Sequence, residues 1–435
     1  MILTALRTTG PLSGTVRVPG DKSISHRAVL FAAMAEGTSR LTGVLDSADV
    51  RSTLAAVTAL GAQVDVAPAR TVGLDITVTG WGVAGPHRPS SVIDCGNSGT
   101  TCRLLMGALA PWPVTVTLDG DPSLRRRPMR RVTDPLTLMG AGFTTTDGHL
   151  PVTMEGGSLR ALRYESPIAS AQVKTAILLA GLGARGVTTV IEPVTSRDHT
   201  ERLLPAFGVG VGRDAASNSS WVEGPEQLAA RDVAVPADPS SAAFIAGAAI
   251  VVPGSEVLLR DVALNPTRTG FLRVLERMGA NVEVVLEGAT GAEPSGTVRV
   301  RYTPGLRGTV VPSEEVPSLV DEVPLLAVVA CSATGVTRFE GISELRVKES
   351  DRLSAIVDGL TTLGATVRAG RDWLEVEGPA RLHGARLTSL GDHRLAMAWA
   401  VAALQADGSV EIEEWEAVDV SYPDFARDLG SLSGR

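Results

Sequence analysis

The stretch VRVPGDKSISHRAVLFAAMAEG, residues 16–37, decides the fold because its pattern returns five more times along the chain. In each copy a strand-like run leads into a Gly, Ser or Asp turn, and the turn opens an apolar helix rich in small residues. The copies begin at Val16, Val92, Tyr164, Val233, Val316 and Leu390. Their spacing of roughly 70 to 80 residues exceeds that of the common solenoid repeats and predicts a βαβ-rich unit.

A second strand and an amphipathic helix that closes on glycine complete each copy. The closing pairs are Leu60-Gly61, Met139-Gly140, Phe207-Gly208, Met278-Gly279 and Leu363-Gly364, with Leu429-Gly430 as a truncated sixth. Because strands and helices alternate along the whole chain, the sequence predicts an α/β protein.

The length of 435 residues, 44% of them apolar, favours two domains of three repeats each. The chain crosses between the halves near residues 15–19 and again near 231–236, where Val-Arg-Val-Pro and Val-Ala-Val-Pro look like paired linker strands. We therefore expect a discontinuous domain of residues 1–18 plus 236–435, and an inserted domain of residues 19–235.

Charge and cysteine content narrow the function classes. The net charge is −8 with acids and bases interspersed, which disfavours nucleic acid or an anionic membrane surface as a partner. No signal-like start and no apolar run long enough for a bilayer occurs, and the three cysteines form no framework. We expect a cytoplasmic protein that works on small molecules, as a monomer.

Cations recur at the starts of the repeated helices. They are Lys22, Arg27, Arg103, Lys174, His393 and Arg394. A helix N-terminus repels cations and attracts anions, so this placement predicts a multiply anionic ligand. If the three helices of each domain are parallel, their N-termini meet at an interdomain cleft. A single Lys or Arg after a turn is usually a solvated charge, and Arg125 and Arg126 fit that alternative because consecutive residues cannot face one pocket.

Two carboxylates stand among these cations. Asp321 opens the fifth repeated helix, where it is either a helix cap or a group that moves a proton. Glu349 lies three residues before Arg352, so a simple i to i+3 ion pair is the alternative to a role in proton transfer. No spacing resembles a metal site.

Taken together, these turns resemble the 5-enolpyruvylshikimate-3-phosphate synthase family, the 3-phosphoshikimate 1-carboxyvinyltransferases. The motifs are PGDKSISHR from Pro19, Asp94 to Thr100, Arg127-Pro128-Met129, SAQVK from Ser170, Arg346 to Arg352, Asp392-His393-Arg394 and Ser421 to Phe425. The resemblance covers almost the whole chain. It implies a two-domain inverse α/β barrel with three βαβαββ repeats per domain, an active site between the domains, and no metal or organic cofactor.

The resemblance also implies site residues. The shikimate 3-phosphate contacts would be Lys22, Ser23, Arg27, Ser170, Ala171, Gln172, Ser196, Arg197, Asp321 and Lys348. The phosphoenolpyruvate contacts would be Lys22, Asn97, Gly99, Arg127, Gln172, Glu349, Arg352, His393 and Arg394. Asp321 would accept the proton of the attacking hydroxyl, and Lys22 and Glu349 would move the proton at the methylene carbon.

Three positions resemble the second class of this family, which includes glyphosate-tolerant forms. They are Ala171, Arg197 and Val420, where many members have a lysine in place of the valine. Gly99 departs from the tolerant members, which carry alanine there. In this family glyphosate competes with phosphoenolpyruvate and is the longer molecule. Resemblance to the second class therefore does not decide whether this protein is sensitive to glyphosate.

Other functions remain as alternatives. The UDP-N-acetylglucosamine enolpyruvyl transferases share the fold but use a cysteine in an arginine-containing loop. The corresponding loop here, residues 121–130, contains no cysteine. A paralogue that acts on another sugar-like acceptor, or one that only binds, would accommodate Val420. A non-catalytic paralogue would be expected to have lost Asp321, Glu349 or Arg127, and all three are present.

Overall fold

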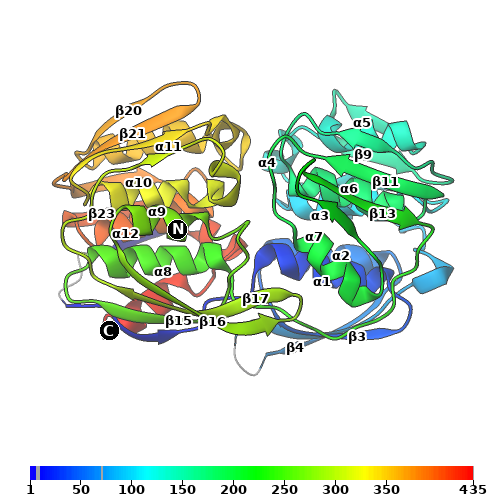
Figure 1. Cartoon of the computed structure of the whole chain (residues 1–435), viewed down its shortest axis with the longest axis horizontal. Helices are drawn as coiled ribbons and strands as arrows, with labels where there is room; N and C mark the ends of the chain where they lie inside the picture. The colour runs from blue at the N-terminus through cyan, green and yellow to red at the C-terminus, as the bar shows by residue number, and fades with distance from the viewer. Residues whose placement is uncertain (6–9, 70–71, 435) are drawn as a thin grey trace. The chain divides into compact units, whose positions relative to one another are not determined.

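The structure is a computed structural model that describes residues 1–5, 10–69 and 72–434 (Figure 1). The chain divides into two compact units. Unit 1 holds Met1–Pro19, Pro236–Thr290 and Pro294–Arg435, and unit 2 holds Gly20–Val235 together with Gly291–Glu293. The placement of residues 291–293 in unit 2 has no signal in the sequence.

The six repeated helices form where the pattern predicts them. They are α1 (Lys22–Met34), α3 (Gly99–Leu109) and α6 (Ala171–Gly181) in unit 2, and α8 (Pro239–Val251), α10 (Val323–Ala330) and α12 (His393–Ala403) in unit 1. Five of them begin at an Asp or Ser side chain that accepts a backbone N–H of the first turn, as Asp21 does from Ile24. The exception is α10, whose N-cap is Glu322 and makes no such bond.

The second helices follow in the same order. They are α2 (Ala48–Ala59), α5 (Arg130–Met139), α7 (His199–Leu203) with η2 (Leu204–Phe207), α9 (Gly270–Arg277), α11 (Arg352–Thr362) and α13 (Phe425–Leu432). The first five end at the predicted glycines, all with positive φ, for example 104° at Gly61. Gly430 differs because it lies inside α13. Short helices complete the set: α4 (Pro122–Arg125), η1 (Gly82–Ala84), η3 (Val316–Ser318), η4 (Val320–Glu322), η5 (Ser343–Val347) and η6 (Trp415–Val420).

Each unit contains three small sheets. The first sheet of unit 2 runs β14 (Val233–Ala234), β3 (Thr38–Val44), β5 (Leu74–Thr79) and β4 (Gln63–Pro68). The second runs β6 (Ile93–Asp94), β7 (Thr115–Asp119), β9 (His149–Glu155) and β8 (Gly142–Thr146). The third runs β10 (Arg163–Glu165), β11 (Gly186–Ile191), β13 (Ser219–Gly224) and β12 (Gly212–Asp214).

The sheets of unit 1 repeat this arrangement. The first runs β16 (Asn281–Thr290), β17 (Glu293–Arg301), β15 (Glu256–Ala263) and β2 (Ser13–Val16). The second runs β18 (Val310–Val311), β19 (Gly335–Glu340), β21 (Trp373–Gly378) and β20 (Thr366–Ala369). In the part of the chain that the structure describes, the third consists of β1 (Ile2–Ala5), β23 (Asp407–Glu413) and β22 (His383–Thr388).

The strands at the two chain crossings do not pair with each other, contrary to the sequence expectation. β2 lies parallel to β15, the strand after α8, and β14 lies parallel to β3, the strand after α1. In the other four repeats the strand before a helix pairs in parallel with the strand after it, as β6 does with β7. The two crossing strands are thus exchanged, and each fills the edge position that the other would have taken.

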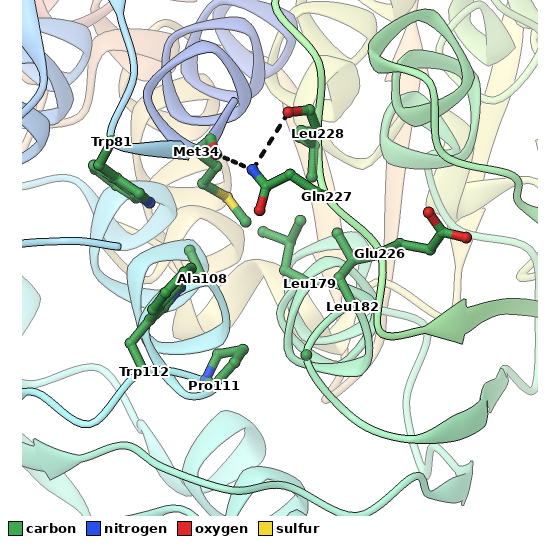
Figure 2. A pocket seen from close by; sticks show the side chains of 11 residues that line it. Met34, Trp81, Ala108, Pro111, Trp112, Leu179, Leu182, Glu226, Gln227 and Leu228 are labelled. Carbon is green, nitrogen blue, oxygen red and sulfur yellow. Dashed lines mark hydrogen bonds between the residues drawn. The ribbon is translucent and has the colours of Figure 1, made fainter. Parts of the chain in front are cut away.

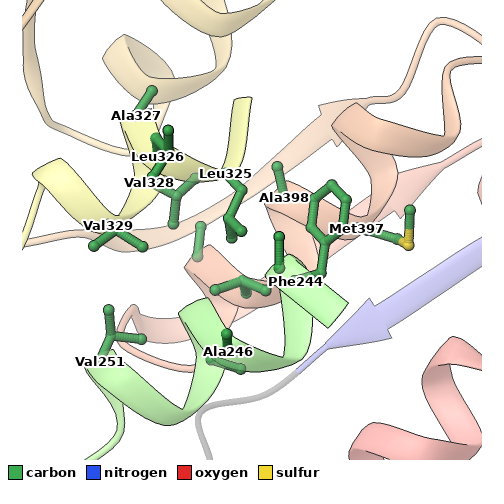
Figure 3. Packing of buried hydrophobic residues seen from close by; sticks show 14 of the residues in the cluster. Phe244, Ala246, Val251, Leu325, Leu326, Ala327, Val328, Val329, Met397 and Ala398 are labelled. Atoms are coloured by element: carbon green, nitrogen blue, oxygen red, sulfur yellow. The ribbon is translucent and has the colours of Figure 1, made fainter. Parts of the chain in front are cut away.

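The repeated helices form the core of each unit because they are apolar on all sides. All 13 residues of α8 are buried, and Phe244 packs with Leu325 of α10 and Met397 of α12 (Figure 3). Removing a side chain of this size from such a core typically costs about 3 to 5 kcal/mol. The helix positions are therefore fixed by packing, which holds the polar residues at their N-termini in place. Among the described residues, no helix is long and apolar enough to cross a membrane.

Candidate functional site

Polar side chains gather in one cluster in each unit. We call Lys22, Arg27, Asn97, Arg103, Arg127 and Gln172 the unit 2 cluster, since they lie at or near the N-terminal ends of α1, α3 and α6. We call Asp321, Glu349, Arg352, Asp392 and Arg394 the unit 1 cluster, which surrounds the starts of α10, α11 and α12. The structure thus brings together, within each unit, the residues that the sequence singled out from separate repeats.

The α1 side of the unit 2 cluster holds two cations in different ways. Lys22 Nζ lies 2.6 Å from Asp49 Oδ2 of α2, with the lysine side chain 18% exposed. Arg27 is buried and donates to Thr200 Oγ1 at 2.8 Å and to Thr175 Oγ1 at 2.9 Å. Burial lowers the pKa of Arg27 to about 10, against the opposing effect of nearby carboxylates, so the guanidinium remains charged at neutral pH.

Two more arginines flank the start of α3. Arg103 donates to Gln172 Oε1 of α6 at 2.7 Å, and Gln172 in turn donates to Thr100 Oγ1 at 2.9 Å. Arg127 donates to Asn97 Oδ1 at 2.8 Å. A methyl group placed on Gly99 would lie 2.8 Å from Arg103 Nη1 and 3.3 Å from Arg127 Nη1. Glycine at this position therefore leaves room for both guanidinium groups beside the helix start.

Lys174, one of the cations that the repeat pattern places at a helix start, is buried between two carboxylates. Its side chain is 4% exposed, and Nζ lies 2.8 Å from both Glu192 and Glu201. Burial alone would lower the pKa of Lys174, but the two carboxylates outweigh it and raise the pKa. Its charge is therefore already balanced within the protein. The periodic pattern finds the position of such a residue but not its partners.

Ser170 and Ser196 lie on either side of Glu192. Ser170 caps α6, and its backbone N–H donates to Glu192 Oε1 at 3.0 Å. Ser196 is 5% exposed, and its Oγ has no hydrogen-bond partner among the described residues. Ser23, Ala171 and Arg197 are half-buried in the same unit. All the residues that resemblance assigns to shikimate 3-phosphate, apart from Asp321 and Lys348, thus belong to unit 2.

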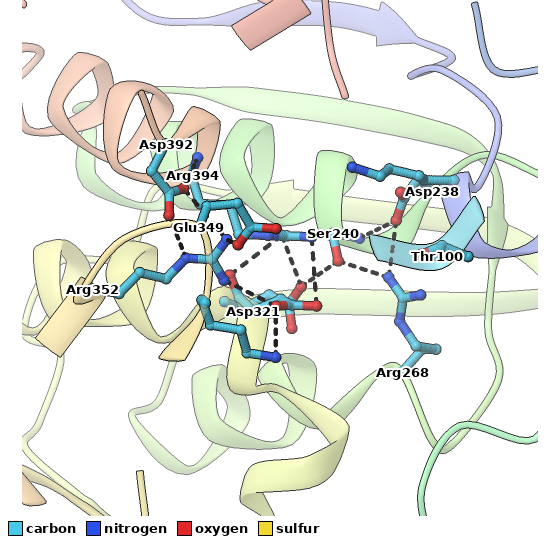
Figure 4. A network of polar contacts seen from close by, with 12 residues as sticks. Thr100, Asp238, Ser240, Arg268, Asp321, Glu349, Arg352, Asp392 and Arg394 are labelled. Carbon is cyan, nitrogen blue, oxygen red and sulfur yellow. Dashed lines mark hydrogen bonds and ion pairs between the residues drawn. The ribbon is translucent and has the colours of Figure 1, made fainter. Parts of the chain in front are cut away.

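The centre of the unit 1 cluster is Arg352, whose side chain is 1% exposed (Figure 4). It donates to Asp392 Oδ2 at 2.7 Å, to Glu349 Oε2 at 2.6 Å and to Asp321 Oδ1 at 3.1 Å. Burial opposes its charge, but the three carboxylates outweigh burial and raise the pKa of Arg352. The ion pair between Glu349 and Arg352 is therefore real, and it belongs to a larger buried network.

Asp321 lies in η4 before α10 and is 7% exposed. Besides Arg352, its carboxylate faces Arg394 Nη2 at 3.6 Å and Lys348 Nζ at 3.9 Å. Three cationic side chains therefore surround this one carboxylate. Because the N-cap of α10 is Glu322, capping does not account for Asp321. His393, the first residue of α12, is buried beside Arg394.

A second set of buried polar residues supports this cluster, and the sequence reasoning missed it. Ser240 donates to Glu322, and Arg268 donates to Ser240 Oγ at 2.7 Å and to Asp238 Oδ1 at 3.1 Å. Burial raises the pKa of Glu322. The positive charge of Arg394 opposes this shift, and the negative charge of Asp321 adds to it. The only sequence signal was the Asp-Pro helix start at Asp238. No pattern links it to Arg268, 30 residues further along the same repeat, or to Glu322 in the next repeat.

A pocket lined mainly by apolar side chains lies in unit 2, away from the polar cluster (Figure 2). It is lined by Met34, Trp81, Ala108, Trp112, Leu179 and Leu182, among others. Met34, Ala108 and Leu179 lie near the C-terminal ends of α1, α3 and α6, whereas the cluster lies near their N-terminal ends. At 1.5 Å per residue, these ends are about 12 to 18 Å apart. In the described parts of the chain, no group of three or more His, Cys, Asp or Glu side chains could hold a metal ion.

Comparison with known proteins identifies the fold. A solved structure titled "Crystal structure of the enolpyruvyl transferase NikO from Streptomyces tendae" matches with a TM-score of 0.79 at 20% identity, over 99% of this chain and 97% of that one. An EPSP synthase structure from Acinetobacter baumannii matches with a TM-score of 0.88 at 39% identity, over 99% of this chain and 98% of that one. The fold is therefore that of the enolpyruvyl transferases.

Sequence comparison gives the family. The family model described as EPSP synthase (3-phosphoshikimate 1-carboxyvinyltransferase) matches residues 6–429. A 3-phosphoshikimate 1-carboxyvinyltransferase from Halorhodospira halophila is 50% identical over 97% of this chain and 94% of its own. One from Brevibacillus brevis is 46% identical over 97% and 98%. The chain belongs to the EPSP synthase family, as the resemblance of its motifs predicted.

Proposed function

We propose that the two clusters carry out the 3-phosphoshikimate 1-carboxyvinyltransferase reaction that family membership gives this chain. In this reaction the enolpyruvyl group of phosphoenolpyruvate is transferred to the 5-hydroxyl of shikimate 3-phosphate, and phosphate is released. It is the sixth step of the shikimate pathway to chorismate and the aromatic amino acids. The main support for the catalytic roles assigned below is the position of Asp321. Its carboxylate is nearly buried and lies among three cations.

Unit 2 supplies most of the proposed contacts to shikimate 3-phosphate. We assign its phosphate to Ser170, Ser196 and Arg197, because a hydroxyl, a helix N-terminus and a guanidinium are the groups that bind phosphate. Lys22, Ser23, Arg27, Ala171 and Gln172 take the remaining contacts from unit 2, and Asp321 and Lys348 take those from unit 1. Support comes from Ser196 Oγ, which is buried and has no partner among the described residues.

Phosphoenolpyruvate is assigned to side chains from both units. Arg127 beside Asn97 and Gly99 supplies charge from unit 2, together with Lys22 and Gln172. Arg352, Arg394, His393 and Glu349 supply the rest from unit 1. Guanidinium groups bind carboxylate and phosphate in a bidentate manner, which suits a substrate that carries one of each.

We assign the proton movement from the resemblance of the motifs, and the surroundings of Asp321 support it. The oxygen of the 5-hydroxyl attacks the second carbon of phosphoenolpyruvate while Asp321 accepts the hydroxyl proton. Lys22 or Glu349 protonates the methylene carbon in the same step. The resulting tetrahedral adduct loses a methyl proton and phosphate to give the product. The arginines stabilise the charge that grows on the departing phosphate. The side chain of Lys22 is partly exposed, and its ion pair with Asp49 holds the ammonium group in place.

The test is a coupled assay for phosphate release from phosphoenolpyruvate. Release with shikimate 3-phosphate, and not with UDP-N-acetylglucosamine or shikimate, is expected. Release with another acceptor only would favour a paralogue of different specificity, and no release in the presence of measurable binding would favour a binding-only paralogue.

We also propose that the protein belongs to the second class of the family, because it carries Ala171, Arg197 and Val420. We further propose that it is a monomer in the cytoplasm without nucleic-acid or membrane partners. Light scattering after gel filtration tests the monomer.

A further inference from the structure

Glu192 follows strand β11 in unit 2, and its side chain is only 3% exposed. Four contacts engage its two carboxylate oxygens or the backbone next to them. Oε1 accepts from Ser170 N at 3.0 Å, Oε2 accepts from Ser196 N at 3.5 Å, and Oε2 lies 2.8 Å from Lys174 Nζ. Asn218 Nδ2 donates to the Glu192 carbonyl at 2.7 Å. One buried carboxylate thus joins the start of α6 to the loop before α7.

The two serines lie on separate segments that are 26 residues apart in the chain. No hydrogen bond between their backbones is needed to keep them together, because the carboxylate accepts from both. The bond from Ser170 N has an ordinary length, whereas the contact from Ser196 N at 3.5 Å is longer and weaker. A charged acceptor strengthens both relative to a neutral one. Glu192 therefore sets where Ser196 Oγ lies relative to the N-terminus of α6.

Lys174 makes the burial of this carboxylate possible. A lone buried carboxylate would take up a proton rather than stay charged, because burial disfavours the charged form. The ammonium of Lys174 lies 2.8 Å from Glu192 and also 2.8 Å from Glu201. Glu201 differs from Glu192 in its other contact, which is the hydroxyl of Ser220 rather than a backbone N–H of either serine.

From these contacts we infer that Glu192 is a positioning residue for the phosphate group of shikimate 3-phosphate. It does not touch the substrate but holds Ser170 and Ser196 at the spacing that the phosphate requires. This inference rests on the proposed function, which assigns the phosphate to those serines. A purely structural role would instead affect both substrates and would be shared with Glu201.

The test compares Glu192→Gln with Glu201→Gln. Each variant leaves Lys174 with one carboxylate, so the two match in buried charge. Both variants lose one acceptor oxygen, but only Glu192→Gln loses one that faces the backbone N–H groups of Ser170 and Ser196. An amide has one oxygen and one NH₂ group, so it cannot accept from both serines and from Lys174 as the carboxylate does. We expect the KM for shikimate 3-phosphate to rise about 10- to 100-fold in Glu192→Gln, with kcat and the KM for phosphoenolpyruvate within about threefold of the parent.

Two readouts separate phosphate positioning from general damage. The affinity for shikimate, which lacks the phosphate, should stay the same in Glu192→Gln, while that for shikimate 3-phosphate falls. Glu201→Gln should leave both unchanged. Equal rises in both KM values, or the same rise in Glu201→Gln, would overturn the inference. If Glu192→Gln does not fold, Glu192→Asp keeps the charge beside Lys174 but withdraws the oxygens by one methylene group, and the same selective rise is expected.

The activity of the parent protein separates failure of the positioning role from failure of the proposed function. If the parent releases phosphate with shikimate 3-phosphate and Glu192→Gln behaves like Glu201→Gln, only the positioning role is wrong. If the parent shows no release with shikimate 3-phosphate, the proposed function itself fails.

Discussion

Replacement of Gly99 by alanine adds one methyl group at the first residue of α3. The backbone accepts alanine without strain, because Gly99 is not among the glycines with positive φ. The methyl carbon would lie 2.8 Å from Arg103 Nη1, whereas an ordinary contact begins near 3.4 Å. Arg103 must therefore retreat by about 0.6 Å. The end of a long side chain can make this movement, so we expect the variant to fold.

The movement strains the hydrogen bond from Arg103 to Gln172, which is 2.7 Å long. Complete loss of a hydrogen bond to a charged group costs about 1.5 to 3 kcal/mol, or about 10- to 150-fold in binding. Because 0.6 Å weakens the bond without breaking it, we expect the KM for phosphoenolpyruvate to rise by about 3- to 10-fold. The inhibition constant of glyphosate, the longer competitor, should rise at least about tenfold more than this KM. The reason is that the methyl group also meets the extra length of glyphosate.

Steady-state rates at matched phosphoenolpyruvate give both constants for the parent and Gly99→Ala. Gly157→Ala is the control, because a methyl group there meets no atom within 4 Å in the same unit. Equal rises in the glyphosate inhibition constant and the KM would show that the methyl group acts through Arg103 alone. A parent that already resists millimolar glyphosate would refute the role of Gly99 altogether.

Three further predictions concern catalysis, substrate binding and stability. Asp321→Asn keeps shape but removes the proton acceptor, so kcat should fall by about two to four orders of magnitude with little change in shikimate 3-phosphate binding; near-normal turnover would exclude the proposed role. Arg127→Ala should raise the KM for phosphoenolpyruvate about 10- to 100-fold with the thermal midpoint nearly unchanged, and an equal rise for both substrates would contradict the assignment. Burial, aided by Lys22 and Arg27, holds the pKa of His26 well below its usual value, so below about pH 6.5 the unfolded chain binds a proton that the folded chain does not. Stability should therefore fall as the pH drops, and His26→Gln should flatten this decline by up to about 1.4 kcal/mol per pH unit in urea titrations; parallel curves for the two proteins would count against it.

The sequence determined much of this protein because its features are local and repeated. Apolar runs and turn residues fix the six core helices, and glycine fixes five helix ends, since only glycine readily adopts the positive φ found there. The same turns carry Lys22, Arg27, Arg103 and Arg394, so local periodicity also located the candidate site.

The tertiary structure decided what depends on contacts between distant residues. The exchange of strands β2 and β14 between sheets could not be read from Val-Arg-Val-Pro and Val-Ala-Val-Pro, because both segments have the same local pattern and strand pairing is chosen by the available edge. Likewise, Lys174 looks like an anion ligand in the sequence, and only packing places it between two carboxylates. The physical reason is that secondary structure follows from neighbours along the chain, whereas the state and partners of a buried charge follow from residues that folding brings beside it.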